Sequence, residues 1–257
     1  MIKLKVATIQ LLCSISRAGG TPYLVGGCVR DYVMGITPKD IDVEVYGMSY
    51  NTLLAVVAEY KPKVVGESFG VIKVDLRPWG GDELDLSLPR RDSKNGVGHK
   101  GFNIEFSSDM TLEEASARRD FTMNSMAMNP FTGEIIDPWG GLQDIKKNII
   151  RHTSDSFSDD PLRVLRLMQF VGRFGFDVDY QTLWQCCRLR CEFNTLPRER
   201  IKEEFDKLFL KGRYIKLGLE VLNATGWLSC FPELFAMWGL PQDHTWHPEG
   251  CVWTHTL

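Results

Sequence analysis

One segment of six residues constrains this chain more than any other, because polar and apolar side chains alternate strictly from Asp40 to Val45. Such period-two alternation predicts a β-strand with one buried face and one solvated face. Asp40, Asp42 and Glu44 then lie together on the solvated face. Clustered carboxylates repel one another, and Mg²⁺ prefers hard oxygen ligands of this kind. The segment therefore predicts either a magnesium site or an acidic strand face in water.

A glycine turn lies only ten residues before this strand. Residues 24–31, LVGGCVRD, predict a short strand, a Gly-Gly turn and the start of a helix. Two glycines let backbone N–H groups approach an anion closely, and the beginning of a helix favours negative charge. Arg30, one turn into that helix, is placed to pair with a phosphate. The alternative is a tight turn with a surface arginine, but the nearby acidic strand favours an anion-binding turn.

The rest of the pattern predicts an α+β domain over about 1–150 followed by an all-α region. Polar residues and glycines over 90–103 predict a loop. Strand alternation is missing over 112–128 and again from 161 onwards, where apolar residues recur at helical spacing. Further elements are expected as helices over 1–20, 29–34 and 50–60, and as strands over 23–25, 69–76 and 83–88, the last two forming a hairpin.

The second strand of that hairpin offers two more acidic side chains. Glu83 and Asp85 share one face of the strand with Ser87, and apolar residues occupy the other face. Either carboxylate would complete a metal shell from a neighbouring strand. The alternative is that both face solvent, and the pattern does not choose between these interpretations.

Composition excludes several classes of protein. The chain has 257 residues, a formal net charge of −3 and a pI near 6.0. This excludes a histone-like polycation, although a nucleic-acid enzyme needs only one basic face. No apolar run is long enough to cross a bilayer, and we expect residues 1–20 to form a surface helix, not a signal peptide. Seven cysteines without a CxxC motif predict reduced thiols in a cytoplasmic protein.

Five ordered sequence blocks carry a resemblance to a known family. They are LVGGCVRD at 24–31, KDIDVEV at 39–45, RRDFTMNSMA at 118–127, DPWGGLQD at 137–144 and DDPLRVLR at 159–166. In this order and spacing they resemble the core of the class II tRNA nucleotidyltransferases, the CCA-adding enzymes, and of the related bacterial poly(A) polymerases. The resemblance covers some 150 residues of the chain.

This resemblance implies an architecture of three parts. The first is a nucleotidyltransferase catalytic domain with a polymerase-β-like mixed sheet, over residues 1–150. A helical neck that recognises the base would follow over 151–225. Residues 226–257 would form a helical body and the start of an incomplete HD-type region, in which His255 stands where such domains carry their first metal ligand.

The resemblance also implies roles for individual residues of the first domain. Asp40 and Asp42 would be the catalytic pair that holds two Mg²⁺ ions. Gly27 and Arg30 would contact the triphosphate of the incoming nucleotide, and Arg119 would also hold that nucleotide. Near the ribose, where hydrogen bonds to the 2′-hydroxyl favour ribonucleotides, the family pattern places Asp120 and Asn124.

The block at 159–166 has a physical logic of its own. Asp160, Arg163 and Arg166 recur every three residues and so share one face of a helix that begins near Pro161. An aspartate accepts from an exocyclic amine, and an arginine donates to ring nitrogens or carbonyl oxygens. CTP and ATP both present such an amine beside a ring acceptor, whereas GTP and UTP present a carbonyl. The alternative is a capped helix with surface salt bridges.

Two positions depart from the family pattern in this block. Gln169 stands where many members carry a further arginine that also takes part in nucleotide binding, and Asp159 replaces a glutamate. Glutamine keeps a hydrogen-bonding group but removes a positive charge. The departure at Gln169 therefore leaves open the nucleotide affinity, or the exact choice between C and A.

One further motif matches a pattern only by its letters. Residues 96–101, GVGHKG, fit the GxGxxG signature of dinucleotide sites, but they follow a polar segment and open no helix. A flexible loop is the better interpretation of that stretch.

The residues and the family that they resemble together predict a template-independent RNA nucleotidyltransferase. It would add C and A from CTP and ATP to the 3′ end of tRNA and release pyrophosphate, with Mg²⁺ as cofactor. The alternatives are a poly(A) polymerase, an enzyme that adds only part of CCA, or a non-catalytic RNA-binding remnant. Basic residues of the helical region would bind tRNA, although acidic residues are mixed with them, and the sequence leaves the oligomeric state open.

Overall fold

The computed structural model describes residues 1–65, 70–94, 102–107 and 109–257. The described residues form two compact units. The first unit contains described residues between 1 and 147 and the short segment 152–156, and the second contains 148–151 and 157–257.

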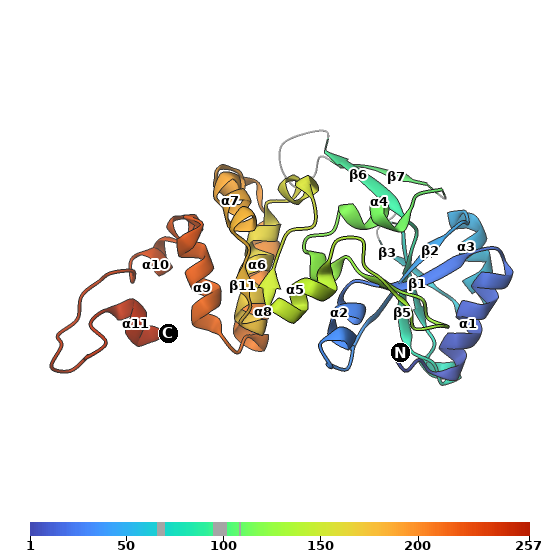
Figure 1. Ribbon diagram of the computed structural model, residues 1–257, viewed down its shortest axis with the longest axis horizontal. Helices are drawn as coiled ribbons and strands as arrows, with labels where there is room; N and C mark the ends of the chain where they lie inside the picture. The colour runs from blue at the N-terminus through green and yellow to red at the C-terminus, as the bar shows by residue number, and fades with distance from the viewer. Residues whose placement is uncertain (66–69, 95–101, 108) are drawn as a thin grey trace. The chain divides into compact units, whose positions relative to one another are not determined.

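A mixed sheet of seven strands forms the centre of the first unit (Figure 1). Its strands in spatial order are β3 (Lys63–Val65), β4 (Val71–Asp75), β5 (Glu83–Ser87), β2 (Ile41–Tyr46), β1 (Thr21–Val25), β8 (Ala127–Met128) and β9 (Ile135–Ile136). Strand β2, which carries the acidic segment, pairs antiparallel with β1 and parallel with β5 and so lies in the middle of the sheet. The predicted hairpin is confirmed, because β4 and β5 pair antiparallel.

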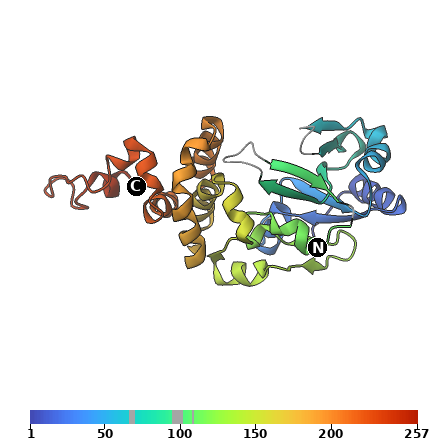
Figure 2. The same cartoon turned by 90° about the horizontal axis from the view of Figure 1, so that it is seen from above.

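Helices α1 (Val6–Arg17) and α3 (Tyr50–Val57) cover the same side of this sheet, as Figure 1 and Figure 2 both show. Leu11, Leu12 and Ile15 recur at helical spacing along α1 and are fully buried together with Leu53 of α3. Each such side chain contributes about 1.5–3 kcal/mol when it is fully buried. This core holds the middle strands, and therefore the acidic segment, in place.

The prediction of a loop over residues 90–103 was wrong for its two ends. Residues Arg90–Lys94 form β6 and Phe102–Phe106 form β7, which pair antiparallel as a small second sheet. Hydrogen bonds between backbone groups hold such a pair, so the wholly polar sequence of β6 forms a strand beside β7, whose sequence FNIEF does alternate. Residues 95–101, which contain the GVGHKG motif, lie outside the described part of the chain.

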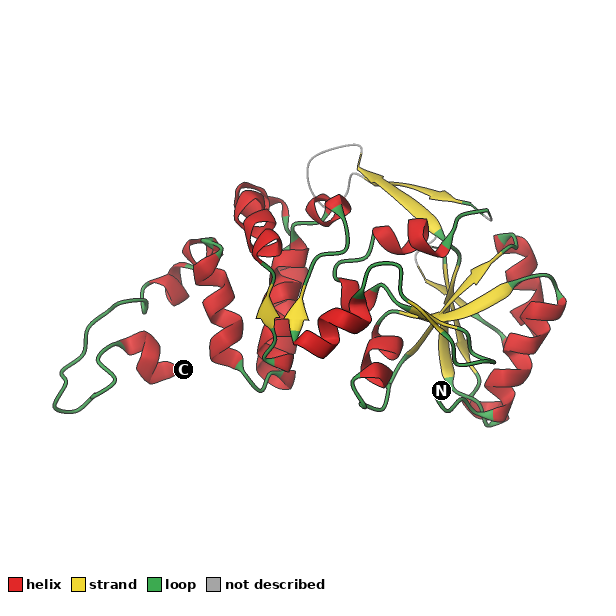
Figure 3. Cartoon of the chain, in the orientation of Figure 1, coloured by secondary structure: helices red, strands yellow, loops and turns green. Residues whose placement is uncertain are grey.

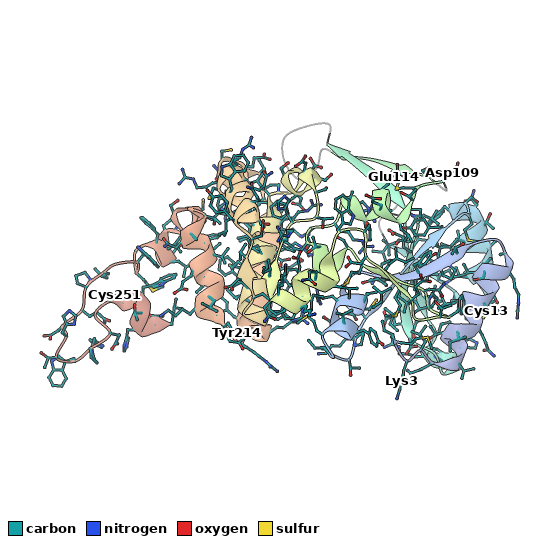
Figure 4. All side chains as sticks on the ribbon, in the orientation of Figure 1. Lys3, Cys13, Asp109, Glu114, Tyr214 and Cys251 are labelled. Atoms are coloured by element: carbon teal, nitrogen blue, oxygen red, sulfur yellow. The ribbon has the colours of Figure 1, made fainter. Side chains whose placement is uncertain are left out.

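The small sheet lies beside helix α4 (Leu112–Ala117), as Figure 1 shows. A capping box begins this helix: the Glu114 amide donates to Oγ1 of Thr111 over 3.2 Å, and the Thr111 amide donates to Oε2 of Glu114 over 3.0 Å. Figure 4 marks Glu114 at this helix start. The sequence predicts no strand over 112–128. This prediction was wrong at the end of the range, where residues Ala127–Met128 form β8 of the main sheet.

Helices predominate in the second unit (Figure 3). They are α6 (Leu162–Phe174), α7 (Tyr180–Arg188), α8 (Arg198–Lys211), α9 (Ile215–Ala224), α10 (Pro232–Phe235) and α11 (Val252–Thr256). The expected all-α character has one exception, the parallel pair of β10 (Ile149–Ile150) and β11 (Asp177–Val178). Helix α6 packs against α8 and α9, and a Cβ on Gly172 of α6 would lie 3.7 Å from Cα of Gly218 of α9.

The remaining elements are short. They are α2 (Gly27–Val33), α5 (Gly141–Lys147) and the 3₁₀ turns η1 (Ala58–Tyr60), η2 (Arg77–Trp79), η3 (Thr122–Asn124), η4 (Asp155–Asp159), η5 (Leu189–Thr195) and η6 (Trp227–Cys230).

All seven cysteines are free thiols, as the sequence predicts. Figure 4 marks Cys13 on α1 and Cys251 immediately before α11. Among the described residues, no helix has both the length and the apolar character that a bilayer crossing requires.

Candidate active site

The glycine turn is the point at which the predicted site residues meet. Strand β1 ends at Val25, Gly26 turns the chain with a φ of 72°, and α2 begins at Gly27. That φ lies in the left-handed region, which favours glycine. A Cβ on Gly26 would lie 2.9 Å from Nη1 of Arg119 and 3.7 Å from Oδ2 of Asp42. A guanidinium and a carboxylate therefore both approach the backbone of this turn.

Asp42 lies on β2, directly beside β1. In the register of the sheet, Val43 is the partner of Leu24, so Asp42 lies near the end of β1 where the glycine turn begins. Asp40 precedes the first residue of β2 and is exposed to solvent. The two carboxylates expected to hold metal thus come from one end of one strand.

The surroundings of the Asp42 carboxylate disfavour its charged form. Burial raises its pKa above the ordinary value, and the negative charges of Asp85 and Asp40 add to this rise, while Arg119 opposes it. No group in the described part of the chain donates a hydrogen bond to this carboxylate. A half-buried carboxylate in this state gains stability from a bound cation. The donor set of Asp42 and Asp40 therefore fits Mg²⁺.

Asp85 is the nearer of the two additional acids. It is the register partner of Asp42 on the parallel strand β5, and Lys73 of β4 stands opposite it. The Lys73 ammonium donates to both oxygens of Asp85, over 3.0 and 2.7 Å. Glu83 is the first residue of β5, its Oε2 lies 3.4 Å from Nη2 of Arg77, and its side chain is 52% exposed. Asp85 thus lies beside Asp42 in the sheet, but the Lys73 ammonium already pairs with it.

The expectation that Glu44 lies on a solvated face was wrong. Glu44 is 1% exposed, because two arginines and a tyrosine cover its side chain. Oε1 of Glu44 accepts from Nη2 of Arg118 over 2.9 Å and lies 3.7 Å from Nη2 of Arg119, and Oε2 accepts from the Tyr46 hydroxyl over 2.6 Å. Burial alone would raise the pKa of Glu44, but these guanidinium groups and the hydroxyl outweigh it and lower the pKa.

Arg30 is buried beneath the turn and is 5% exposed. Its Nε and Nη2 donate to Oδ1 of Asp31 over 2.8 and 2.6 Å, and its Nη1 donates to Oδ1 of Asn124 over 2.8 Å. A Cβ on Gly27 would lie 3.5 Å from Nη2 of Arg30. Arg30, the predicted phosphate ligand, therefore also links α2 to the distant segment that contains Asn124.

That loop contains the residues expected near a ribose. Asp120 and Asn124 are each 6% exposed. Oδ1 of Asp120 accepts from the Phe121 amide over 2.8 Å and from Nδ2 of Asn124 over 2.9 Å. Arg30, Asn124 and Asp120 thus form one hydrogen-bonded chain. The sequence does not predict these hydrogen bonds, because no periodicity connects Arg30 with residues so distant along the chain.

The expected base-reading residues lie in the second unit, on α6 and just before it. Oδ1 of Asp160 accepts from the amide of Leu162, the first residue of α6, over 3.0 Å, and Pro161 is the N-cap. Asp160, Arg163 and Arg166 are each partly exposed, whereas Gln169 is 4% exposed.

A comparison with known families decides the assignment of the chain. A family model described as the poly(A) polymerase head domain matches residues 22–151. The chain belongs to this poly(A) polymerase head family. A second model, described as a probable RNA- and SrmB-binding site of polymerase A, matches residues 175–237. The matched ranges include the glycine turn, the acidic strand and the Arg118–Arg119 pair.

Relatives within this family are similar over most of the chain. A multifunctional CCA protein of Nitrosococcus oceani is 39% identical over 91% of the chain and 56% of its own length, and one of Vibrio vulnificus is 41% identical over the same shares. The chain therefore spans a little more than half the length of these curated relatives.

Solved structures of family members share the fold. The chain is similar to a CCA-adding enzyme from Bacillus stearothermophilus in complex with CTP, with a TM-score of 0.73 and 29% identity over 85% of this chain and 51% of the other. It is also similar to a Thermotoga maritima CCA-adding enzyme complexed with tRNA, with a TM-score of 0.69 and 26% identity over 87% of this chain and 51% of the other. The predicted mixed-sheet nucleotidyltransferase fold followed by helices is confirmed.

A second group of metal-ligating side chains lies near residue 257. Nδ1 of His255 contacts Oε1 of Glu249, and Nδ1 of His247 lies 3.7 Å from the same oxygen. Ligand atoms of the three residues all lie within 4.8 Å of one another. Of these three residues, the resemblance implied a metal-ligand position for His255 alone, and the proximity of Glu249 and His247 is visible only in the folded chain.

Proposed function

We propose that the chain is a template-independent RNA nucleotidyltransferase that adds C and A from CTP and ATP to the 3′ end of tRNA and releases pyrophosphate. One observation carries the proposal: the carboxylate of Asp42 and the guanidinium of Arg119 approach the same glycine turn at Gly26. Nucleotidyl transfer needs a cation-binding carboxylate and a phosphate-binding group side by side. The printed descriptions of the relatives, CCA protein and CCA-adding enzyme with CTP or tRNA, support this choice of substrates.

Asp40 and Asp42 would hold Mg²⁺ in this reaction. When bound, the metal would lower the pKa of the attacking 3′-hydroxyl and neutralise charge on the leaving pyrophosphate. The raised pKa of Asp42 supports this assignment, since a carboxylate without compensating donors is the group that a cation would stabilise. Asp85 would contribute less, because Lys73 already neutralises it.

The triphosphate would lie against the turn formed by Gly26 and Gly27. The absence of side chains there leaves backbone N–H groups accessible to phosphate oxygens. Arg119 would pair directly with a phosphate. Arg30 would add positive potential from beneath Gly27 and, through Asn124, would hold Asp120 in position near the ribose.

The base would be selected by Asp160, Arg163 and Arg166. Their shared face supports this proposal, and the acceptor–donor pattern of an aspartate beside an arginine suits C and A better than G and U. The helical neck over 151–225 would carry this function, and the body over 226–257 would follow it in the sequence.

The match of 175–237 to a probable RNA-binding segment supports tRNA binding by the helices. We place the protein in the cytoplasm, where free thiols are the rule.

The test is incubation of the 257-residue protein with a tRNA that lacks its CCA end and with each labelled nucleotide. The proposal predicts that CTP alone adds only the C residues, that ATP completes the end, and that GTP and UTP are not used. A long run of A residues would identify a poly(A) polymerase, and extension that stops within CCA would identify a partial enzyme. Binding of the tRNA without any extension would identify a non-catalytic remnant and refute the proposal.

A further inference from the structure

Glu44 is a buried carboxylate that the proposed reaction does not use. It follows Asp40 and Asp42 on the same strand, but its side chain is only 2% exposed and so is unavailable to a metal ion in solvent. Charged side chains are almost never fully buried unless they are paired. Its three partners, Tyr46, Arg118 and Arg119, therefore define what this carboxylate does.

The arrangement holds the guanidinium of Arg119 at both ends. Nη2 of Arg119 lies 3.7 Å from Oε1 of Glu44, and Nη1 lies 3.5 Å from the carbonyl oxygen of Asn124 and 2.9 Å from the position of a Cβ on Gly26. The Arg119 side chain is 18% exposed. A flexible arginine is thereby held in one orientation, with Nη1 directed at the glycine turn.

Glu44 makes unequal contacts with the two arginines. Its single negative charge faces the positive charges of both Arg118 and Arg119. Arg118 makes the closer contact with Glu44, at 2.9 Å against 3.7 Å for Arg119. The carboxylate therefore orients Arg119 without neutralising the pair.

The hydroxyl of Tyr46 fixes the carboxylate in turn. It donates to Oε2 of Glu44 over 2.6 Å and leaves Oε1 facing the two arginines. Glu44 and Tyr46 are two residues apart on β2, so both side chains lie on one face of the sheet. Tyr46 also packs edge-on against Tyr23 of β1, at 5.8 Å between ring centroids, which limits its movement.

We propose that Glu44, itself held by Tyr46, is a positioning residue that orients Arg119 toward the phosphates of the nucleotide at the Gly26–Gly27 turn. This inference rests on the proposed function, because it assigns the support of a group that the reaction would use. A purely structural role would predict that loss of Glu44 affects folding alone.

The experiment compares Glu44→Gln with the wild-type protein by the KM and kcat for CTP and by the Kd for CTP in calorimetry. Glutamine keeps the shape of the side chain but removes its charge. We expect KM and Kd to rise roughly tenfold, because a charge-assisted contact no longer holds the arginine, and kcat at saturating CTP to change less than about threefold. The control Asp75→Asn removes a carboxylate that also pairs with an arginine, Arg77, at the end of β4. It should leave all three constants unchanged.

A second set of variants separates positioning from folding. If Glu44→Gln folds poorly because two partly buried cations lose their counter-charge, Glu44→Gln combined with Arg118→Met removes one of them. Positioning predicts that KM stays raised in this folded double variant, whereas a structural role predicts that KM returns to the wild-type value. Tyr46→Phe should raise KM in the same direction but by a smaller factor.

Coupling to Arg119 gives the decisive comparison. We expect Glu44→Gln to add nothing to the KM and Kd of Arg119→Ala, since both changes disable the same contact. Independent, multiplying effects, or an unchanged KM in folded Glu44→Gln, would overturn the inference. If the wild-type protein adds no nucleotide, the proposed function fails and the Kd values alone decide the role of Glu44. Absence of any CTP binding would overturn both.

Discussion

Gly26 and Arg119 lie so close that no side chain fits between them: a Cβ on Gly26 would stand 2.9 Å from Nη1 of Arg119. The two residues are far apart in the sequence, yet the turn after β1 and the loop after α4 meet here. Asp42 approaches the same point from β2, with Oδ2 at 3.7 Å from that Cβ position. The requirement for glycine thus has two causes, the positive φ of 72° and the space taken by the guanidinium.

The substitution Gly26→Ala tests the second cause. Gly35 has the same φ of 72° but nothing within 4 Å of its Cβ position, so Gly35→Ala is a control for the positive φ. Both variants should lose stability, and Gly26→Ala should lose more, because its ψ of −134° lies outside the left-handed helical region that other residues can adopt. Only Gly26→Ala should displace Arg119, and it should therefore raise the KM for CTP roughly tenfold or more. Equal KM values in the two variants would show that the guanidinium is not needed at the turn.

The close packing of α6 and α9 predicts an unusual response to an added methyl group. Alanine normally stabilises a helix relative to glycine. A Cβ on Gly218, however, would lie 2.7 Å from the carbonyl oxygen of Met168. We expect Gly218→Ala to lower the free energy of unfolding by about 1–3 kcal/mol, measured by urea denaturation. The exposed Lys216→Ala in the same helix should change it by less than about 0.5 kcal/mol. A stabilised Gly218→Ala would contradict the helix contact.

Thiol reactivity should divide the cysteines by burial. Burial raises the pKa of the Cys28 thiol to about 11, with a further contribution from the charge of Asp42, and burial likewise raises the pKa of Cys186. At pH 8 both thiols stay protonated and are unreactive. A colorimetric thiol reagent should label the exposed Cys187 and Cys191 quickly, and Cys28 and Cys186 only after unfolding. Rapid labelling of Cys28 in the folded protein would contradict the packing of α2 against β2.

The raised pKa of Asp42 makes a prediction about stability. A carboxyl whose pKa is raised by folding destabilises the folded protein at pH values above that pKa, and the penalty disappears as the pH falls through it. In the presence of a chelator, Asp42→Asn should therefore raise the melting temperature at pH 7, and the gain should shrink on acidification. Magnesium should stabilise the wild type and not the variant. A lower melting temperature for Asp42→Asn at pH 7 would show that the charge is compensated within the chain.

Much of the first unit follows from local sequence pattern. The alternation from Asp40 to Val45 predicts β2, and the glycine pair predicts the turn into α2, because period and turn chemistry are local properties. The burial of Glu44 does not follow from them. It depends on Arg118 and Arg119, which only the folded chain brings to β2. The adjacent pair of arginines was the one available signal that a buried carboxylate had partners.

Two other features depend on tertiary structure in the same way. Strand β6, RRDSK, is polar throughout and gives no alternation to recognise, whereas the alternation of its partner β7, FNIEF, is only five residues long and follows a polar, glycine-rich stretch. The hydrogen bond between Arg30 and Asn124 joins residues that are 94 positions apart, and a surface arginine was the expected alternative. Burial of a polar side chain is decided by its distant partners, and a single sequence does not reveal them.

The most direct test of the central claim is single-turnover addition of labelled CMP to a tRNA that lacks its CCA end, catalysed by Asp42→Asn. Asp75→Asn is the control, and circular dichroism establishes that both variants are folded. We predict that Asp42→Asn loses activity by a factor on the order of a thousand or more while the control matches the wild type. Addition of CMP by folded Asp42→Asn at a rate near that of the wild type would contradict the account.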